Sequence, residues 1–575
     1  MDSFALSTSK HVFGGILIRL LFLTWVCVFP MLGHTNEFPM ETCSNIHNTD
    51  AESLTPNRQI LDAQRLPLAA PNREIHQINL VQLNVFNTDL PEENNAIFRF
   101  ANRAHIQTKP EVIRSILLFN EGELYHPEKL IESERLLRQQ RYLYDARIYA
   151  DVACAGDIHV TVVTRDLWTL LPDLGFSHSG GESTSRIGFR ETNLLGLGKR
   201  LSLTYTKDAE RTGYLFVYED PNILGSRYTG RIDYADNDDG QMHMVALSYP
   251  FFATDTPYSY GLTTASNTRV ESQYERGDVV NEFEQTSEIN AVYFGFSTSL
   301  GNDWTRRVLF GYQQDEETFN SVLDTTLELA ENRKNSFPFV ELNWFENDYV
   351  KVRNVDSIFR TEDLQLGWDV RARVGYSDES ISNDLSRLLY WFSAQKAEYL
   401  TEKSLLKIEL MAQGAWRPDE EIYENQLTAL SLQYYYNDDI ETSWYAGAQY
   451  QHINNMTRDQ QVTLGGETGL RGYNANYLQG NQKWLLNLER RYYWEYDLWQ
   501  LFKVGGAAFV DVGKVAGNPL FAEELGWLSD AGVGLRLAPS RANSNTMLHL
   551  DVAWPLKKFD DSDSVQWLFT VKNRF

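Results

Sequence analysis

The sequence predicts a membrane protein of the all-β class: a C-terminal transmembrane antiparallel β-barrel preceded by one small α/β domain. From residue 186 onward, one segment after another alternates apolar and polar residues with a period of two. Aromatic residues make up 13% of the chain, yet its mean hydropathy is −0.40. This combination is typical of a barrel whose strands are apolar at every second position, with Tyr and Trp at both membrane interfaces.

Length and charge exclude some classes of protein. The chain has 575 residues, which is too many for one ordinary core, so two or more domains are expected. Its formal net charge of −26 argues against a nucleic-acid partner, because nucleic-acid binders are normally basic. A soluble all-β protein would share this composition, with its apolar faces turned inward. The two ends of the chain have to distinguish these classes.

Residues 1–33 have the pattern of a secretory signal peptide. Lys10, His11 and Arg19 precede an apolar run from Leu20 to Gly33. The run is too short to span a bilayer, although an uncleaved anchor is the alternative. After Gly33 no window of eighteen mainly apolar residues follows, so a chain that crosses the membrane after this point has to do so as a closed barrel. Residues 34–73 are expected to form a flexible lead-in, because they are rich in Thr, Asn, Ser and Pro.

Two cysteines follow the signal peptide, Cys43 and Cys154. In an oxidising compartment they can form a disulfide. The alternative is two separate thiols, since the sequence does not show that the residues approach each other.

Residues 74–170 have the pattern of an α/β unit with the order β-α-α-β-β. A strand-like run, Ile75–Phe86, comes first. Thr108–Glu111 then reads as a capping box with Pro in the first helical turn, and a second helix is expected from Pro127 to Arg141. Two strands, Ala146–Cys154 and Ile158–Leu170, complete the unit.

This unit resembles a POTRA domain. The resemblance lies in the run Thr108–Gly122 and in Leu130–Tyr144. Such domains precede the barrel in the BamA/TamA-type outer-membrane assembly and transport superfamily, also described as the bacterial surface antigen family. One copy is recognisable here, whereas the assembly factors usually carry several. An unrelated small α/β domain is the alternative.

The barrel is expected to occupy residues 186–575. In Arg200–Lys207, for example, Leu201, Leu203 and Tyr205 share one face and the polar residues share the other. About 390 residues, divided into strands of roughly ten residues with turns and some long loops, give about sixteen strands. Periodicity alone also fits fourteen or eighteen, and the resemblance implies sixteen.

The last strand-like run keeps one apolar face up to the C-terminal residue. That face carries Trp567, Phe569, Val571 and Phe575. It resembles the terminal signal by which bacterial barrels are recognised for assembly. An ordinary amphipathic strand is the alternative.

The most specific match is a short loop motif: Leu470, Arg471, Gly472 and Tyr473. It resembles the superfamily's Arg-Gly-aromatic tip on a long loop that folds back into the barrel lumen. Glu489 and Asp511 match inward acidic positions on two later strands, and their alternation with apolar neighbours also points them inward.

Physical chemistry gives the same expectation for Arg471. Its charge is permanent, so a loop that carries it into the lumen needs a carboxylate partner there. We therefore expect Arg471 to pair with Asp511, Glu489 or both. The alternative is an exposed Gly-rich turn.

Signals for catalysis are weak. The glycines near 465–472 lack the Lys-Ser/Thr and the helix of a phosphate loop, and neither a nucleophile elbow nor a His-Glu-x-x-His motif occurs. We therefore expect no enzyme activity, no cofactor and no metal. Acidic runs such as Asp560–Asp563 are expected to be solvated loops.

The resemblance implies a barrel in the outer membrane that assembles, inserts or translocates protein clients. The POTRA-like domain would receive an unfolded or secreted client in the periplasm by strand addition. Outer-membrane lipid and lipopolysaccharide are the other expected partners. A dedicated two-partner-type secretion transporter and a plain channel are the alternatives.

Overall fold

The computed structural model describes residues 73–152, 158–172, 175–300, 303–517, 524–542 and 547–572. The predicted signal peptide, nearly all of the lead-in, Cys43, Cys154 and Phe575 lie outside the described residues. Among the described residues, no helix is both long and apolar enough to cross a membrane.

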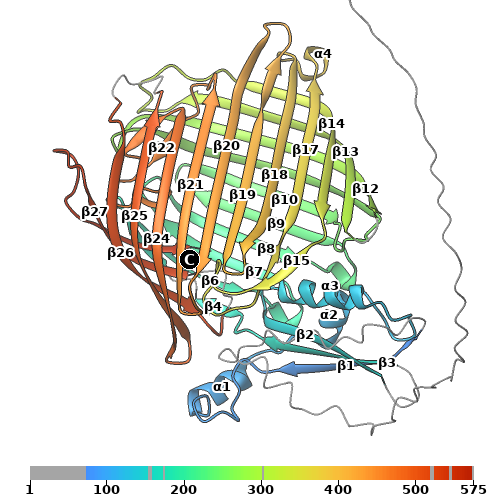
Figure 1. The fold of residues 1–575 in the computed structure, drawn as a ribbon. Helices are drawn as coiled ribbons and strands as arrows, with labels where there is room; N and C mark the ends of the chain where they lie inside the picture. Colours follow the sequence, from blue (N-terminus) through green and yellow to red (C-terminus); the bar gives the residue numbers. More distant parts are fainter. Residues whose placement is uncertain are drawn as a thin grey trace, which may run out of the picture. The chain divides into compact units, whose positions relative to one another are not determined.

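The N-terminal α/β domain is built on a sheet with the order β1-β3-β2. β1 (Ile75–Leu83) runs parallel to β3 (Ile158–Asp166), and β2 (Leu143–Val152) runs antiparallel to it. Helices α2 (Pro110–Ile116) and α3 (Pro127–Arg138) cover one face of this sheet (Figure 1). Its fully buried core residues include Ile75, Ile113, Leu130, Leu137, Ile158 and Val160.

The domain contains a helix that the sequence did not predict, α1 (Ala96–Ala104). Its order is therefore β-α-α-α-β-β instead of β-α-α-β-β. The Asn95 side chain caps α1 by accepting the N–H of Phe98 at 2.9 Å. Phe98 is the one buried residue of this nine-residue helix, so the apolar residues of α1 do not form a face that packs on the domain core.

Two local details of the domain also differ from the prediction. The capping box is wrong: α2 follows Lys109, and the N–H and hydroxyl of Thr108 donate instead to Asp166 at 2.8 and 3.0 Å. The Asp166 carboxylate, which is distant in the sequence, replaces the predicted cap because it accepts both the N–H and the hydroxyl of Thr108. Helix α3 ends at Arg138, three residues before the predicted end at Arg141.

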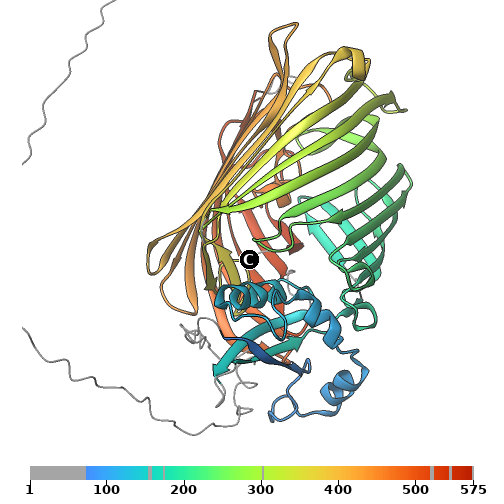
Figure 2. The same ribbon diagram turned by 90° about the vertical axis from the view of Figure 1, so that its right-hand side faces the viewer.

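The barrel is a closed antiparallel ring, as predicted (Figures 1 and 2). Its strands are β4 (Leu170–Pro172), β5 (Gly175–Ser179), β6 (Glu182–Glu191), β7 (Arg200–Lys207), β8 (Thr212–Asp220), β9 (Thr229–Asn237), β10 (Gly240–Tyr249), β11 (Tyr258–Glu275), β12 (Asp278–Leu300), β13 (Trp304–Ser321), β14 (Arg333–Glu346), β17 (Gly367–Ser377), β18 (Arg387–Thr401), β19 (Ser404–Arg417), β20 (Ile422–Asn437), β21 (Thr442–Asn454), β24 (Gln482–Leu498), β25 (Phe502–Ala516), β26 (Leu528–Pro539), β27 (Met547–Pro555) and β28 (Gln566–Lys572). A short helix, α4 (Glu379–Ser382), precedes β18.

The predicted strand number of about sixteen is wrong. β4 and β5 both pair with β6 and are two pieces of one strand, so the ring has twenty strands among the described residues. It also starts at Leu170, before the predicted boundary at residue 186. Many turns are tighter than the estimate assumed, such as Arg276-Gly277 between β11 and β12, so more strands fit into the same length.

Aromatic side chains form a girdle at each end of the barrel wall. We call the end at which β4 begins and β24 ends the domain-side end, and the opposite one the loop-side end. Exposed domain-side aromatics include Tyr258, Trp344, Trp368, Trp444, Tyr496 and Trp499. Exposed loop-side aromatics include Tyr214, Tyr376, Tyr423, Trp554 and Trp567. Two such girdles are the mark of a barrel that spans a bilayer.

Candidate functional site

Residues 455–481, between β21 and β24, fold into the barrel and are called the lumen loop. They contain the short pair β22 (Val462–Leu464) and β23 (Leu478–Gly480). Leu470 and Tyr473 of this loop are completely buried, in a cluster with the wall residues Leu485 and Val515. Apolar packing therefore holds the loop tip against the inner wall.

Arg471 lies at the centre of the lumen loop and contacts both predicted acids. Its Nε and Nη2 atoms donate to the Asp511 carboxylate at 2.7 and 2.8 Å, and its Nη1 lies 3.0 Å from Glu489 Oε1. The guanidinium carbon also lies 3.4 Å from the centroid of the Phe509 ring. A planar fork on a carboxylate, with an aromatic face beneath it, satisfies a buried guanidinium well.

Sequence reasoning missed the rest of this charge network. Arg491 Nε bonds Glu489 Oε2 at 2.9 Å, and Asn487 Nδ2 donates to Asp511 at 2.8 Å. Asp551 lies 3.7 Å from Arg471 and pairs with the fully buried Arg536. Arg491 and Asn487 each lie two positions from Glu489, so extending the same inward parity along β24 predicts both residues.

Gly472 allows the loop to approach the wall. A Cβ atom at this position would lie 2.6 Å from the Cβ of Asp530 and 3.0 Å from the backbone N of Pro555. The next residue, Tyr473, donates its hydroxyl to the carbonyl of Lys557 at 2.9 Å. Along the motif, Arg471 thus places a charge against the wall, Gly472 lets the backbone approach it, and Tyr473 donates a hydrogen bond to it.

The C-terminal strand β28 presents its apolar side chains outward. Trp567 and Val571 are exposed, whereas Gln566, Leu568 and Thr570 are buried on the lumen side. β28 closes the ring on β5, and among the described residues this seam has a single register pair, Phe569 with His178. By contrast, β27 and β28 pair continuously over the length of β28.

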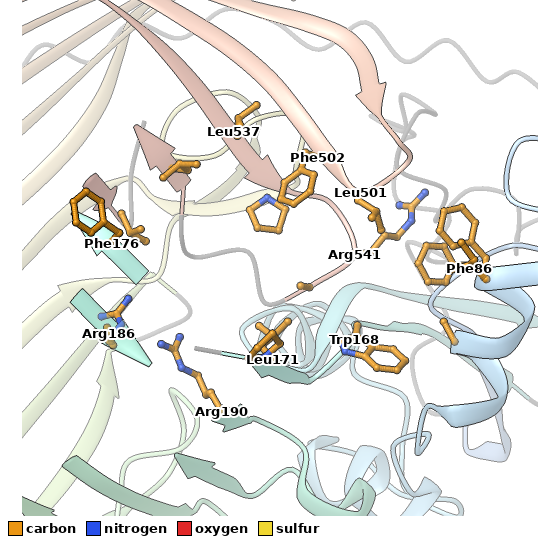
Figure 3. Close-up of a pocket in the computed structure, with 18 of the residues that line it drawn as sticks. Phe86, Trp168, Leu171, Phe176, Arg186, Arg190, Leu501, Phe502, Leu537 and Arg541 are labelled. Carbon is orange, nitrogen blue, oxygen red and sulfur yellow. The ribbon is translucent and has the colours of Figure 1, made fainter. Parts of the chain in front are cut away.

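An apolar cavity of about 600 Å³ lies at the domain-side end of this seam (Figure 3). Trp168, Leu171, Phe176, Phe502 and Phe569 contribute to its lining. Figure 3 also shows Arg186 and Arg190 of β6 at its edge. The weakest join in the ring therefore borders a space wide enough for side chains.

A second segment, residues 347–366 between β14 and β17, enters the domain-side mouth of the barrel. We call it the mouth strap; it contains β15 (Tyr349–Val352) and β16 (Glu362–Gln365). Val352 and Val355 pack against Ala397, Leu405 and Tyr435 of one stretch of wall. Farther along the strap, Ile358 and Phe359 pack in one cluster with Tyr493, Ala538 and Met547. Because the strap contacts both stretches of wall, it crosses the mouth.

Helix α3 of the α/β domain holds the mouth strap by charge. Arg138 forks onto Asp363, with Nε and Nη2 at 2.8 and 2.6 Å from the two carboxylate oxygens. Lys351 Nζ lies 2.5 Å from Glu134 Oε1, and the Arg135 guanidinium lies 3.6 Å from the centroid of the Tyr349 ring. Burial raises the pKa of Glu134, but Arg138 and Lys351 outweigh it and hold that pKa below its ordinary value. Glu134 is therefore a carboxylate in this latch.

Glu362 stabilises the turn of the mouth strap from within. Its carboxyl group accepts the backbone N–H groups of Val355, Asp356 and Ser357 at 3.2, 3.0 and 3.3 Å. Burial in the mouth, followed by the charge of Asp356, raises the pKa of Glu362 to about 7, although the three N–H groups favour its charged form. Arg360 and Tyr493 are the other ionisable groups that interact with it.

Within the ranges that the structure describes, no group of three or more His, Cys, Asp or Glu residues is placed to hold an ion. The arrangement provides instead two inserted segments, each held by an arginine fork, inside a ring with one weak seam.

Comparison with known proteins gives a family match for most of the chain. Residues 193–575 match the family model of the Omp85 superfamily domain. No curated protein matches the chain. Similar solved structures include CdiB from Acinetobacter baumannii (13% identity, 87% of this chain, 73% of that chain, TM-score 0.43) and CdiB from Escherichia coli (14%, 86%, 76%, 0.46). BamA from Haemophilus ducreyi lacking POTRA domains 1–3 is also similar (12%, 88%, 85%, 0.38).

We predict that Arg471→Ala lowers the free energy of unfolding of the barrel by about 3–5 kcal/mol, because Asp511 then lies buried without its counter-ion. Arg471→Lys should recover only part of this loss, since an ammonium group cannot make the forked contact. Urea unfolding of the reconstituted barrel measures the effect.

Arg373 provides the matched control for this substitution. It also forks onto an acid of the inner wall, Glu341, but its side chain is 38% exposed, so Arg373→Ala should change stability by only about 1 kcal/mol or less. Equal effects of the Arg471 and Arg373 substitutions would contradict the assignment of Arg471 as the residue that pins the lumen loop.

We predict that the mouth strap loosens as the pH rises. Glu362 has an ordinary pKa of 4.5 and one of about 7 in the folded strap, so between these values the folded strap binds more protons than the released one. Its stability is therefore greatest below this window and falls as the pH rises through it. Labelling of an Ile358→Cys thiol, with Cys43 and Cys154 replaced by Ser, measures the release.

The same Ile358→Cys protein with Glu362→Gln serves as the reference, because an amide does not titrate. Dividing the labelling rate of the protein with Glu362 by that of the reference cancels the pH dependence of the thiol itself. The ratio should rise between the two pKa values. A ratio that stays constant across this window shows that Glu362 does not control the strap.

Proposed function

This chain belongs to the Omp85 superfamily, and we propose that its outer-membrane barrel assembles, inserts or translocates protein clients that its α/β domain receives in the periplasm. The domain-side end of the barrel then faces the periplasm and the loop-side end faces the cell exterior. The clients are unfolded or secreted polypeptides.

The observation that carries this proposal is the weak seam. Backbone groups in a membrane have to be paired, which normally makes opening a barrel very costly. The seam between β28 and β5 has one register pair among the described residues, so it is the join that opens at the least cost. An opened seam offers two strand edges, and an extended client strand can add to either.

The α/β domain offers a further strand edge on β2, which lies at the border of its sheet. On that edge the N–H of Ile148 donates to Glu134 Oε2 at 2.8 Å, and the carbonyl of Ala146 accepts from Arg138 Nη1 at 3.2 Å. An added strand would use these two backbone groups among others. Two side chains thus occupy the edge in the absence of a client.

The same two side chains hold the mouth strap, since Glu134 binds Lys351 and Arg138 binds Asp363. A client strand that pairs with Ala146 and Ile148 displaces both and weakens the latch. Arrival of a client would in this way open the mouth below the seam. A plain channel has no use for a mouth strap tied to a strand edge, which favours client handling over passive conduction.

The proposal predicts that deletion of residues 74–168 leaves a folded, heat-modifiable barrel in the outer membrane but removes its client from that membrane or from the medium. Quantitative mass spectrometry of both fractions measures this loss. Loss of several outer-membrane proteins indicates assembly or insertion, and loss of one secreted protein indicates a dedicated transporter.

A matched control is Lys129→Ala, because Lys129 lies on the same helix as the latch and its ion pair with Glu123 is largely exposed. Both fractions should match those of the unaltered protein. Unchanged fractions after deletion of the domain itself, with the barrel still in the membrane, would contradict client handling and favour a plain channel.

A further inference from the structure

Helix α1 has an apolar face that its own domain does not cover. Ile97 is 74% exposed and Phe100 is 66% exposed, whereas Phe98 is buried against Phe86. Arg99 lies on the far side of the helix from Ile97, whereas Arg103 is three residues from Phe100 and lies beside it at the border of the apolar face; both arginines are exposed. An amphipathic helix with apolar and basic faces of this kind suits the boundary between lipid headgroups and acyl chains.

The apolar face of α1 continues into the lipid-facing surface of the barrel. Ile97 and Ala101 line the same cavity as Phe176 and Val571, which are exposed side chains of the outer wall. The lining between α1 and the wall is mostly apolar, and its charged members are Arg186, Arg190 and Arg541. The surface that meets acyl chains on the barrel thus extends to the helix.

The turn between β24 and β25 indicates the depth of α1 relative to the membrane. Leu501 of this turn packs in a cluster with Phe86 and Phe98 beneath α1. Two residues before it, Trp499 is 71% exposed in the domain-side aromatic girdle, which marks the membrane interface. The helix is fixed at this level by the buried ion pair between Glu93, just before α1, and Arg541, after β26.

We propose that α1 is a membrane-surface helix: Ile97 and Phe100 lie in the phospholipid leaflet at the domain-side end of the barrel, and Arg99 and Arg103 contact its headgroup phosphates. This inference rests on the proposed function, which places the domain-side end of the barrel in the periplasm, so that the leaflet at this end consists of phospholipid. The helix then anchors the α/β domain to the membrane beside the seam. It therefore limits the directions in which the domain can move while α3 holds the mouth strap.

Quenching by lipid tests this anchor without any client. A full-length protein with Cys43 and Cys154 replaced by Ser carries an environment-sensitive fluorophore at Phe100→Cys. It is reconstituted into vesicles of phosphatidylethanolamine with a minor share of phosphatidylglycerol, with or without lipids that carry a doxyl quencher. The label at position 100 should lose most of its fluorescence to the doxyl lipids and little to aqueous iodide.

Leu124→Cys is the matched control, because Leu124 is an exposed apolar residue of the same domain that does not line the cavity. Its label should respond to iodide and not to doxyl lipid. In an Arg99→Gln, Arg103→Gln variant, the label at position 100 should be quenched less by doxyl lipid when phosphatidylglycerol is present. A label at position 100 that behaves like the one at 124 overturns the proposal and leaves the face to a protein partner, while the client assay stays independent of this result.

Discussion

Two arginine forks hold the segments that close this barrel. A ring of twenty strands encloses a lumen too wide for wall side chains to fill, so inserted segments have to occupy it. Arg471 on Asp511 holds the lumen loop, and Arg138 on Asp363 holds the mouth strap. A buried charge is tolerated only with its own partner in place, so each fork fixes one position of its segment. Apolar packing of the loop and the strap adds stability around these fixed points.

Arg471 and Arg138 differ in the further groups that they contact, and this difference distinguishes the roles of the two forks. Arg471 contacts charged and aromatic side chains of the barrel wall, which ties the lumen loop to the ring. Arg138 and its neighbour Glu134 contact both the strap and the free edge of β2. The same two side chains bind the strap and the β2 edge at once, so under the proposed function a client strand that takes this edge displaces them and weakens the closure of the mouth. In the proposed function, the α/β domain would act on the barrel through this displacement, with no need for a large change in its own fold.

Parity predicted the inward positions of Glu489 and Asp511, because a strand fixes the direction of every second side chain. The ring, the α/β domain and the outward face of β28 follow from the same periodicities. The mouth strap escaped prediction because its partners, such as Glu134 and Leu405, are distant in the sequence and the strap has no period of its own. Helix α1 escaped prediction because Ile97 and Phe100 face away from the domain. The strand number escaped prediction because periodicity does not give the lengths of the turns.

The central claim is that the mouth strap closes the domain-side mouth and that α3 holds it there. The most direct measurement is the single-channel conductance of the full-length protein in planar bilayers, compared with a variant in which a short Gly-Ser turn replaces residues 349–365. The native protein should show small, infrequent steps, and the variant large and stable ones. Asp363→Arg, which repels Arg138, should show large steps intermittently. Equal conductance of all three proteins would contradict closure by the strap.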